Sequence, residues 1–128
     1  MEGYLVLPDT SVWIEHFKGK TDSIEKLFYD DAVTIVTHAL VITELVLGGI
    51  QEDDVRFHQL DCQIKLKSIG DEEMIRFIFT EGLSGRGIGY VDCCLLASCA
   101  YGTAKMVTLD KRLATVADEL GLLWRMVD

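Results

Sequence analysis

Proline and long apolar runs are both scarce in this chain. Pro8 is the one proline among 128 residues, so few helices are expected to be interrupted. No apolar run reaches the roughly 20 residues of a transmembrane helix, and no positively charged start precedes a long apolar core. These absences argue against a membrane protein, and the sequence predicts a soluble, cytoplasmic one.

The cysteines lack the CxxC spacing of a zinc site. Cys62 stands apart, whereas Cys93, Cys94 and Cys99 lie in one apolar stretch. Adjacent residues of a helix point to different faces, so Cys93 and Cys94 are poorly placed to share a zinc ion. We expect the cysteines to be small buried hydrophobic residues in a reducing compartment. The histidines also lack motif-like spacing and are expected at the surface or half-buried: His16, His38 and His58.

Positive charge is the third property that is scarce. The chain has 12 lysines and arginines against 21 acidic residues, a formal net charge of −9. Such a chain does not hold nucleic acid by net charge alone, but it allows an acidic cluster that holds metal and a basic partner. A local basic rim could still contact nucleic acid, although each candidate could equally be a solvated surface charge: Lys18, Lys20, Arg86, Lys111 and Arg112.

Strands and helices are predicted to alternate along one domain, residues 1–128. Hydrophobic residues make up 49% of the chain, which excludes a disordered protein, and the length suits one compact core. The predicted strands cover 4–7, 34–36, 64–68, 106–109 and 122–126. The predicted helices cover 11–18, 22–30, 39–47, 53–60, 71–81, 91–101 and 111–120. Strands separated by helices imply a parallel sheet covered on both faces, which binds ligands beyond the carboxyl ends of its strands.

Four acidic residues occupy unusual places in this pattern. Asp9 and Asp110 follow two strand-like runs, whereas Glu44 and Asp92 lie inside apolar helices. A carboxylate in an apolar helix is costly unless it has a partner. One hard divalent cation could satisfy all four, because such ions prefer oxygen ligands.

Each of these residues also has an ordinary structural explanation. Asp9 and Asp110 could cap the helices that follow them, Asp92 could stabilise a helix N-terminus, and Glu44 could pair with an arginine such as Arg86. Their order is more specific than any one of them: strand-Asp, helix-Glu, helix-Asp and strand-Thr-x-Asp. Near the first acid, Trp13 and Phe17 share a helix face, for which core packing is expected and a partner-binding surface is the alternative.

At these residues the chain resembles the PIN-domain ribonucleases, and among them the VapC toxins of bacterial and archaeal toxin–antitoxin pairs. The similar segments are DTSVWIEHF (residues 9–17), TEL (43–45), D-x-x-x-x-A (92–97) and TLDKRL (108–113), and they span essentially the whole chain. The resemblance implies an α/β fold, a PIN-like three-layer α/β/α sandwich. Its parallel five-stranded sheet would have the strand order 3-2-1-4-5.

The resemblance also implies the site and its metal. Asp9, Glu44, Asp92 and Asp110 match the acidic quartet that binds Mg²⁺ or Mn²⁺, with Asp9 and Asp92 expected as the most direct ligands. The supporting positions are those that often hydrogen-bond inside the site, and a less regular basic one: Thr10, Thr108 and Arg86.

The implied function is that of a metal-dependent endoribonuclease. It would hydrolyse tRNA or rRNA to products with 5′-phosphate and 3′-hydroxyl ends, and so inhibit translation. A VapB-like antitoxin would neutralise it by inserting an extended segment, often carrying arginine, into the acidic pocket. A homodimer is expected, with operator DNA bound only through the antitoxin complex.

Three other functions are consistent with parts of the pattern. A PIN nuclease for RNA maturation would carry the same acids. A phospho-acceptor signalling domain also has aspartates at strand ends, but it usually pairs acids after the first strand and has a lysine after the last. Here Thr10 and Ser11 follow Asp9, and residues 122–126 contain no lysine. A non-catalytic acidic module that binds a basic protein is the third alternative.

Overall fold

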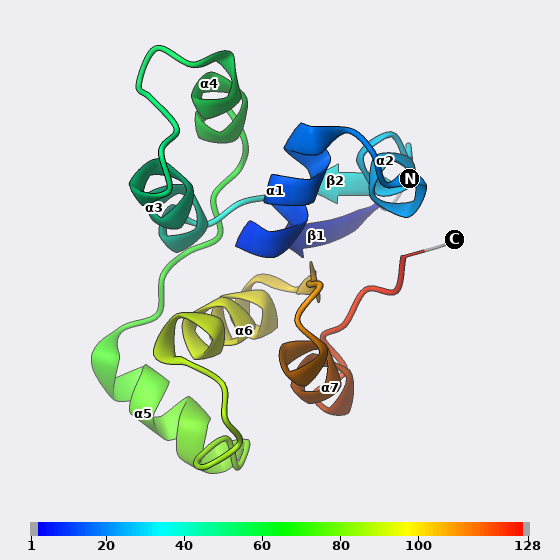
Figure 1. Cartoon of the computed structure of the whole chain (residues 1–128). Helices are drawn as coiled ribbons and strands as arrows, with labels where there is room; N and C mark the ends of the chain where they lie inside the picture. Colours follow the sequence, from blue (N-terminus) through cyan, green and yellow to red (C-terminus); the bar gives the residue numbers. More distant parts are fainter. Residues whose placement is uncertain (1–2, 127–128) are drawn as a thin grey trace.

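The computed structural model describes residues 3–126, in which helices and strands alternate (Figure 1). The strands are β1 (Tyr4–Pro8), β2 (Val33–Ile35) and β3 (Ala104–Val107). The helices are α1 (Thr10–Lys18), α2 (Asp22–Phe28), α3 (Ala39–Leu47), α4 (Val55–Asp61), α5 (Asp71–Thr80), α6 (Tyr90–Gly102) and α7 (Lys111–Glu119). Within the described range, none of these helices is long and apolar enough to span a bilayer.

The described strands form a parallel sheet of order β2-β1-β3. β1 lies in the centre because its apolar residues serve both faces, as is typical of parallel sheets. Val6 and Leu7 are fully buried neighbours that belong to two different core clusters. Successive side chains of a strand point to opposite faces, so one cluster lies on each side of the sheet. This confirms the predicted α/β layering.

The prediction of five strands in the order 3-2-1-4-5 was wrong in the number of strands. In the described structure, segments 64–68 and 122–126 lie at the expected edges, but each makes one isolated parallel bridge: Thr37 with Lys65, and Met106 with Leu123. The first edge cannot lengthen toward α3, because Thr37 lies two residues before that helix begins at Ala39. The alternating polarity of 64–68 therefore indicates a segment at the edge of the sheet, but not one that forms a full ladder of strand hydrogen bonds.

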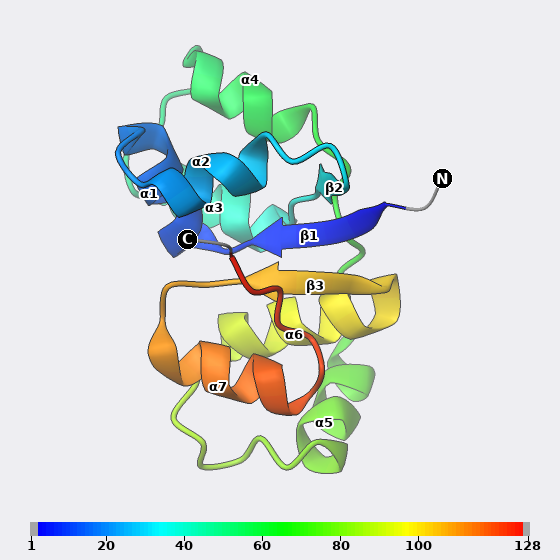
Figure 2. The ribbon, with the colours of Figure 1, turned by 90° about the vertical axis from the view of Figure 1, so that its right-hand side faces the viewer.

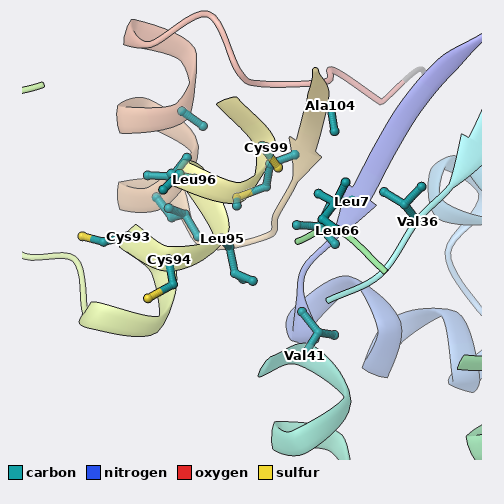
Figure 3. Packing of buried hydrophobic residues seen from close by; sticks show 14 of the residues in the cluster. Leu7, Val36, Val41, Leu66, Cys93, Cys94, Leu95, Leu96, Cys99 and Ala104 are labelled. Carbon is teal, nitrogen blue, oxygen red and sulfur yellow. The ribbon is translucent and has the colours of Figure 1, made fainter. Parts of the chain in front are cut away.

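Helix α6 is the most buried helix of the fold. Its residues from Cys93 to Cys99 are all buried, so it passes through the interior instead of lying on the surface. Leu95 of α6 and Leu7 of β1 belong to the same core cluster, part of which is drawn in Figure 3. The cysteines of α6 are free and buried, as predicted, whereas Cys62 is exposed, which the sequence analysis did not anticipate. Cys93 and Cys94 point in different directions (Figure 3), so they do not form a thiolate pair.

Candidate active site

The carboxyl ends of β1 and β3 and the first turn of α6 lie on the same side of the molecule (Figure 2). Asp9 follows β1 directly and is the N-cap of α1. Asp110 follows β3 and is the N-cap of α7, and Asp92 lies in the first turn of α6. Glu44 comes from the middle of α3. The fold therefore gathers its predicted acids from four different elements.

Asp9 is buried, and both of its carboxylate oxygens accept hydrogen bonds. Its Oδ1 accepts from the backbone N–H of Val12 at 3.2 Å and from the Ser11 hydroxyl. Its Oδ2 accepts from the Thr108 hydroxyl. Burial raises the pKa of Asp9, while the hydrogen bonds from Ser11, Thr108 and the backbone act in the opposite direction. Asp9 is thus a helix cap and a buried acid at once.

Thr108 connects the acids that follow the two strands. While its hydroxyl donates to Asp9, it accepts the backbone N–H of Asp110 at 3.1 Å. The backbone N–H of Leu109 also donates to the Ser11 hydroxyl at 3.1 Å. The prediction that the Thr108 side chain points into the site agrees with this geometry. Ser11 is a further contributor that the sequence analysis considered only as a helix cap.

Glu44 is held by a hydroxyl and not by an arginine. The Thr10 hydroxyl donates to Oε1 of Glu44 at 2.6 Å, which links α1 to α3. The alternative in which Arg86 pairs with Glu44 is wrong, because Arg86 forms an ion pair with Glu119 of α7 at 2.9 Å. Among residues 3–126, Glu44 forms no ion pair within 4 Å, so the hydroxyl of Thr10 binds it without neutralising its charge.

Asp92 shows that the four acids share one electrostatic environment. Its pKa is raised first by burial and then by the negative charges of Asp9, Asp110 and Glu44. Like charges raise a carboxyl pKa only when they lie close enough to interact. Asp9, Glu44 and Asp110 therefore each lie close enough to Asp92 to act on its charge.

The donor set suits a hard divalent cation in its chemistry. Every candidate ligand atom is a carboxylate oxygen, which favours Mg²⁺ or Mn²⁺ over a metal that prefers thiolate ligands. As the side chains stand, no three His, Cys, Asp or Glu residues between positions 3 and 126 are arranged to hold an ion. Mg²⁺ keeps several waters and needs only one or two direct carboxylates, so a closed ligand cage is not required.

The loop before α6 is tied to α7 by two arginines. In addition to the Arg86 pair, Nη1 of Arg112 donates to the carbonyl of Gly87 at 3.2 Å. Gly87 has a φ of 79°, and a Cβ there would lie 2.6 Å from Arg112 Nη1. The structure therefore does not bring Arg86 among the acids, and both arginines are engaged in holding the loop that leads to Asp92.

Substitutions of two glycines test this attachment. Gly85 also has a positive φ, of 72°, but a Cβ there would meet nothing within 4 Å. We expect Gly85→Ala to lower the free energy of unfolding by about 1 to 2 kcal/mol from backbone strain alone. Gly87→Ala should cost about 1 kcal/mol more, because it displaces Arg112 from its hydrogen bond. Urea unfolding measures both values. Equal losses, or an excess that persists in an Arg112→Ala background, would contradict this interpretation.

The predicted burial of His38 was wrong. This residue was expected at the surface or half-buried, but it is fully buried and is the N-cap of α3. The available signal was its position directly before an apolar helix, where a side chain that accepts a hydrogen bond is favoured.

Comparison with known proteins identifies the family. The family model of the PIN domain matches residues 6–119. Ribonuclease VapC32 of Mycobacterium tuberculosis, from strains CDC 1551 / Oshkosh and ATCC 25618 / H37Rv, is 39% identical over 119 residues. These residues cover 92% of this chain and 94% of that protein. The chain belongs to the VapC ribonucleases of the PIN-domain family.

Two solved structures share this PIN fold. VapBC-1 from nontypeable Haemophilus influenzae has a TM-score of 0.66 at 17% identity, covering 94% of this chain and 96% of that one. PAE2754 from Pyrobaculum aerophilum has a TM-score of 0.55 at 16% identity, covering 88% of this chain and 84% of that one. The predicted PIN-like α/β fold is thereby confirmed, and the signalling-domain alternative is wrong.

Proposed function

We propose that this PIN domain is a divalent-metal-dependent endoribonuclease and the toxin of a toxin–antitoxin pair. The observation that carries the proposal is the effect of the negative charges of Asp9, Glu44 and Asp110 on Asp92, in a chain of the VapC family. Asp9, Glu44, Asp92 and Asp110 would hold one or two Mg²⁺ or Mn²⁺ ions. When bound, such an ion supplies charge neutralisation for a phosphodiester and lowers the pKa of water.

The protein's own residues have separate tasks in this proposal. The Thr108 hydroxyl keeps Asp9 and the start of α7 in register across the sheet. The Thr10 hydroxyl holds one oxygen of Glu44 and leaves the other free to bind. Burial of Asp9 keeps water away from its carboxylate, which strengthens its interaction with positive charge. Hydrolysis would leave 5′-phosphate and 3′-hydroxyl ends, without attack by the ribose 2′-hydroxyl.

RNA recognition would depend on shape more than on free positive charge. Three of the five candidate rim cations are engaged within the described structure. Lys18 pairs with Glu15 at 3.2 Å, and Arg86 and Arg112 hold the loop before α6. An acidic protein with few free cations binds RNA weakly without sequence preference. Selection of a particular tRNA or rRNA site through a few contacts fits such a surface.

An apolar groove beside the acids suits the proposed antitoxin. A cavity of about 280 Å³ begins at Thr10 and Glu44 and continues along Ile14 and Phe17 of α1, Leu45 of α3 and Ile50 of the loop that follows α3. An extended VapB-like segment could place apolar side chains there and a basic one at the acids. We further propose a homodimer, and operator DNA bound only through the antitoxin complex.

Incubation with RNA tests the activity. Purified protein free of antitoxin should cut total cellular RNA into discrete fragments with Mg²⁺ or Mn²⁺, and chelator should abolish the cleavage. Mapping of fragment ends should find 5′-phosphates; 2′,3′-cyclic phosphates would contradict the proposed chemistry. Growth arrest on expression, rescued by a neighbouring antitoxin gene, would separate a toxin from an RNA-maturation nuclease. A protein that binds basic peptides but cuts no RNA under any metal would be a binding module.

A further inference from the structure

A buried hydrogen-bond chain links three segments behind the acids. His38 Nδ1 accepts the backbone N–H of Leu40 at 3.0 Å, at the start of α3. His38 Nε2 lies 3.0 Å from the Ser98 hydroxyl of α6. Ser98 in turn donates to the carbonyl of Lys67 at 2.9 Å. His38 and Ser98 are 0% and 2% exposed, so these bonds are protected from water.

The geometry determines the direction of every bond in this chain. Because Nδ1 accepts from Leu40, a neutral ring carries its proton on Nε2 and donates it to Ser98. The Ser98 hydroxyl accepts this hydrogen bond and donates its own proton to the backbone carbonyl of Lys67. Burial lowers the pKa of His38, which keeps the ring neutral. The three donors are the Leu40 N–H, the His38 Nε2–H and the Ser98 hydroxyl, and each has one acceptor. No other assignment of the protons satisfies all three donors.

This hydrogen-bond chain connects α3, which carries Glu44, to α6, which carries Asp92. Glu44 lies six residues after His38 on α3, and Asp92 lies six residues before Ser98 on α6. Each acid is therefore about 9 Å along its helix from the hydrogen-bond chain. Thr108 joins Asp9 to the backbone of Asp110 across the strands. Among side-chain hydrogen bonds of residues 3–126, the one between His38 and Ser98 joins α3 to α6.

We propose that His38 is a positioning residue of this site, which sets the separation of Glu44 and Asp92 through its hydrogen bond to Ser98. The consequence for cleavage rests on the proposed function. A helix released from this bond can slide or turn, and a displacement of about 1 Å at a reacting centre can cost roughly 100-fold in rate. His38 touches neither substrate nor metal in this role.

Two variants break the link from opposite sides. Ser98→Ala removes the hydroxyl of α6 and leaves the cap of α3, whereas His38→Asn keeps a capping oxygen but is too short to reach Ser98. Ser98→Thr retains the hydroxyl and serves as the conservative rescue. Cys99→Ala is the matched control, because it trims a buried side chain of the same helix turn and leaves the link intact.

The expected losses are about 10- to 100-fold in the affinity for Mn²⁺ alone, measured by calorimetry, and in kcat for RNA, with KM little changed. Both link-breaking variants should show them, and Ser98→Thr and Cys99→Ala should not. A slowly exchanging imidazole Nε2–H signal of His38 should be present in the parent and absent in Ser98→Ala. Folded link-breaking variants with the parent's Mn²⁺ affinity and kcat, or a loss equalled by Cys99→Ala, would overturn the proposal.

Crystal structures of the parent and Ser98→Ala test the geometry without any activity. Superposed on the sheet, they should differ in the separation of the Glu44 and Asp92 carboxylates by about 1 Å or more. An unchanged separation overturns the positioning role even if the enzyme is active. A parent that neither binds Mn²⁺ nor cuts RNA refutes the proposed function instead, and the separation then still decides the role of His38.

Discussion

Replacing Asp9 with asparagine should abolish RNA cleavage while making the metal-free protein more stable. We expect the rate to fall by more than about 100-fold, because even outer partners of a metal site are worth about 10- to 100-fold. The backbone arrangement should survive, since asparagine caps a helix as well as aspartate does and its oxygen can still accept from Val12. The Thr108 hydroxyl, which now donates to Oδ2, can turn to accept from the new amide.

The gain in stability follows from the sign of the pKa shift. The folded protein raises the pKa of Asp9 above its usual value, so folding favours the protonated, uncharged form. This contribution is fully present below the pKa of the unfolded chain and is lost as the pH rises through the higher pKa of the folded state. Asp92 behaves in the same way. At neutral pH both charges oppose folding, and an uncharged side chain at position 9 removes one of them.

Urea unfolding in chelator at several pH values checks this reasoning. The parent should become more stable as the pH falls from neutral into the weakly acidic range, and Asp9→Asn should flatten that dependence. Asp54→Asn is a matched control, because Asp54 also caps a helix but Arg56 lowers its pKa to about 2. That substitution should leave cleavage unchanged and should weaken the fold slightly, since the pair is exposed. An Asp9→Asn protein less stable than the metal-free parent would contradict a shared acidic pocket.

Capping a helix does not exclude the proposed metal-binding role of these aspartates. The sequence analysis set the two explanations of Asp9 and Asp110 against each other. In the structure, Asp110 accepts the backbone N–H groups of Arg112 and Leu113 with one oxygen, Oδ1. A carboxylate has a second oxygen, so a cap can stand beside an acidic cluster and still contribute to it. The cap also has a use for the site, because it fixes the backbone from which the acid projects.

Local pattern predicted the elements better than it predicted their pairing. The helix predicted at 39–47 has the bounds of α3, since an apolar run that ends at Gly48 determines both ends. Strand β3 begins at Ala104, two residues before the predicted start, because Ala104 and Lys105 pair with Leu5 and Val6 of β1. That extension depends on a neighbouring strand about 100 residues away, which local periodicity does not contain.

The same limit applies to the candidate site. The acids themselves could be predicted, because a charge in an apolar helix or at a strand end is visible in the sequence. The resemblance indicated Thr10 and Thr108 as hydrogen-bonding positions, but not which atoms they meet, and nothing indicated the bond between His38 and Ser98. The bonds from Thr10 to Glu44 and from His38 to Ser98 span 34 and 60 residues. Such bonds depend on which helices become neighbours. Residue type alone suggested an arginine for Glu44, and the fold supplied a hydroxyl.

Truncation of Trp13 should have the largest effect on stability. Trp13 is fully buried on α1, four residues after Asp9, and its ring packs edge-to-face against Phe28 at a centroid distance of 4.9 Å. We expect Trp13→Ala to cost about 3 to 5 kcal/mol, because it leaves a large cavity in a close-packed interior. A typical domain has only about 5 to 15 kcal/mol in total, so this variant would be close to unfolding.

Trp13→Phe separates packing from hydrogen bonding. The indole N–H of Trp13 finds no acceptor among the described residues, so phenylalanine removes an unpaired donor along with part of the ring. We expect a loss of only about 1 to 2 kcal/mol by chemical denaturation, well below that of alanine. The alternative from the sequence, a partner-binding face at Trp13, requires both variants to fold like the parent and to lose antitoxin binding. If Trp13→Ala left the stability unchanged, the packing described here would be contradicted. Other contacts of α1 would then have to hold Asp9 at the end of β1.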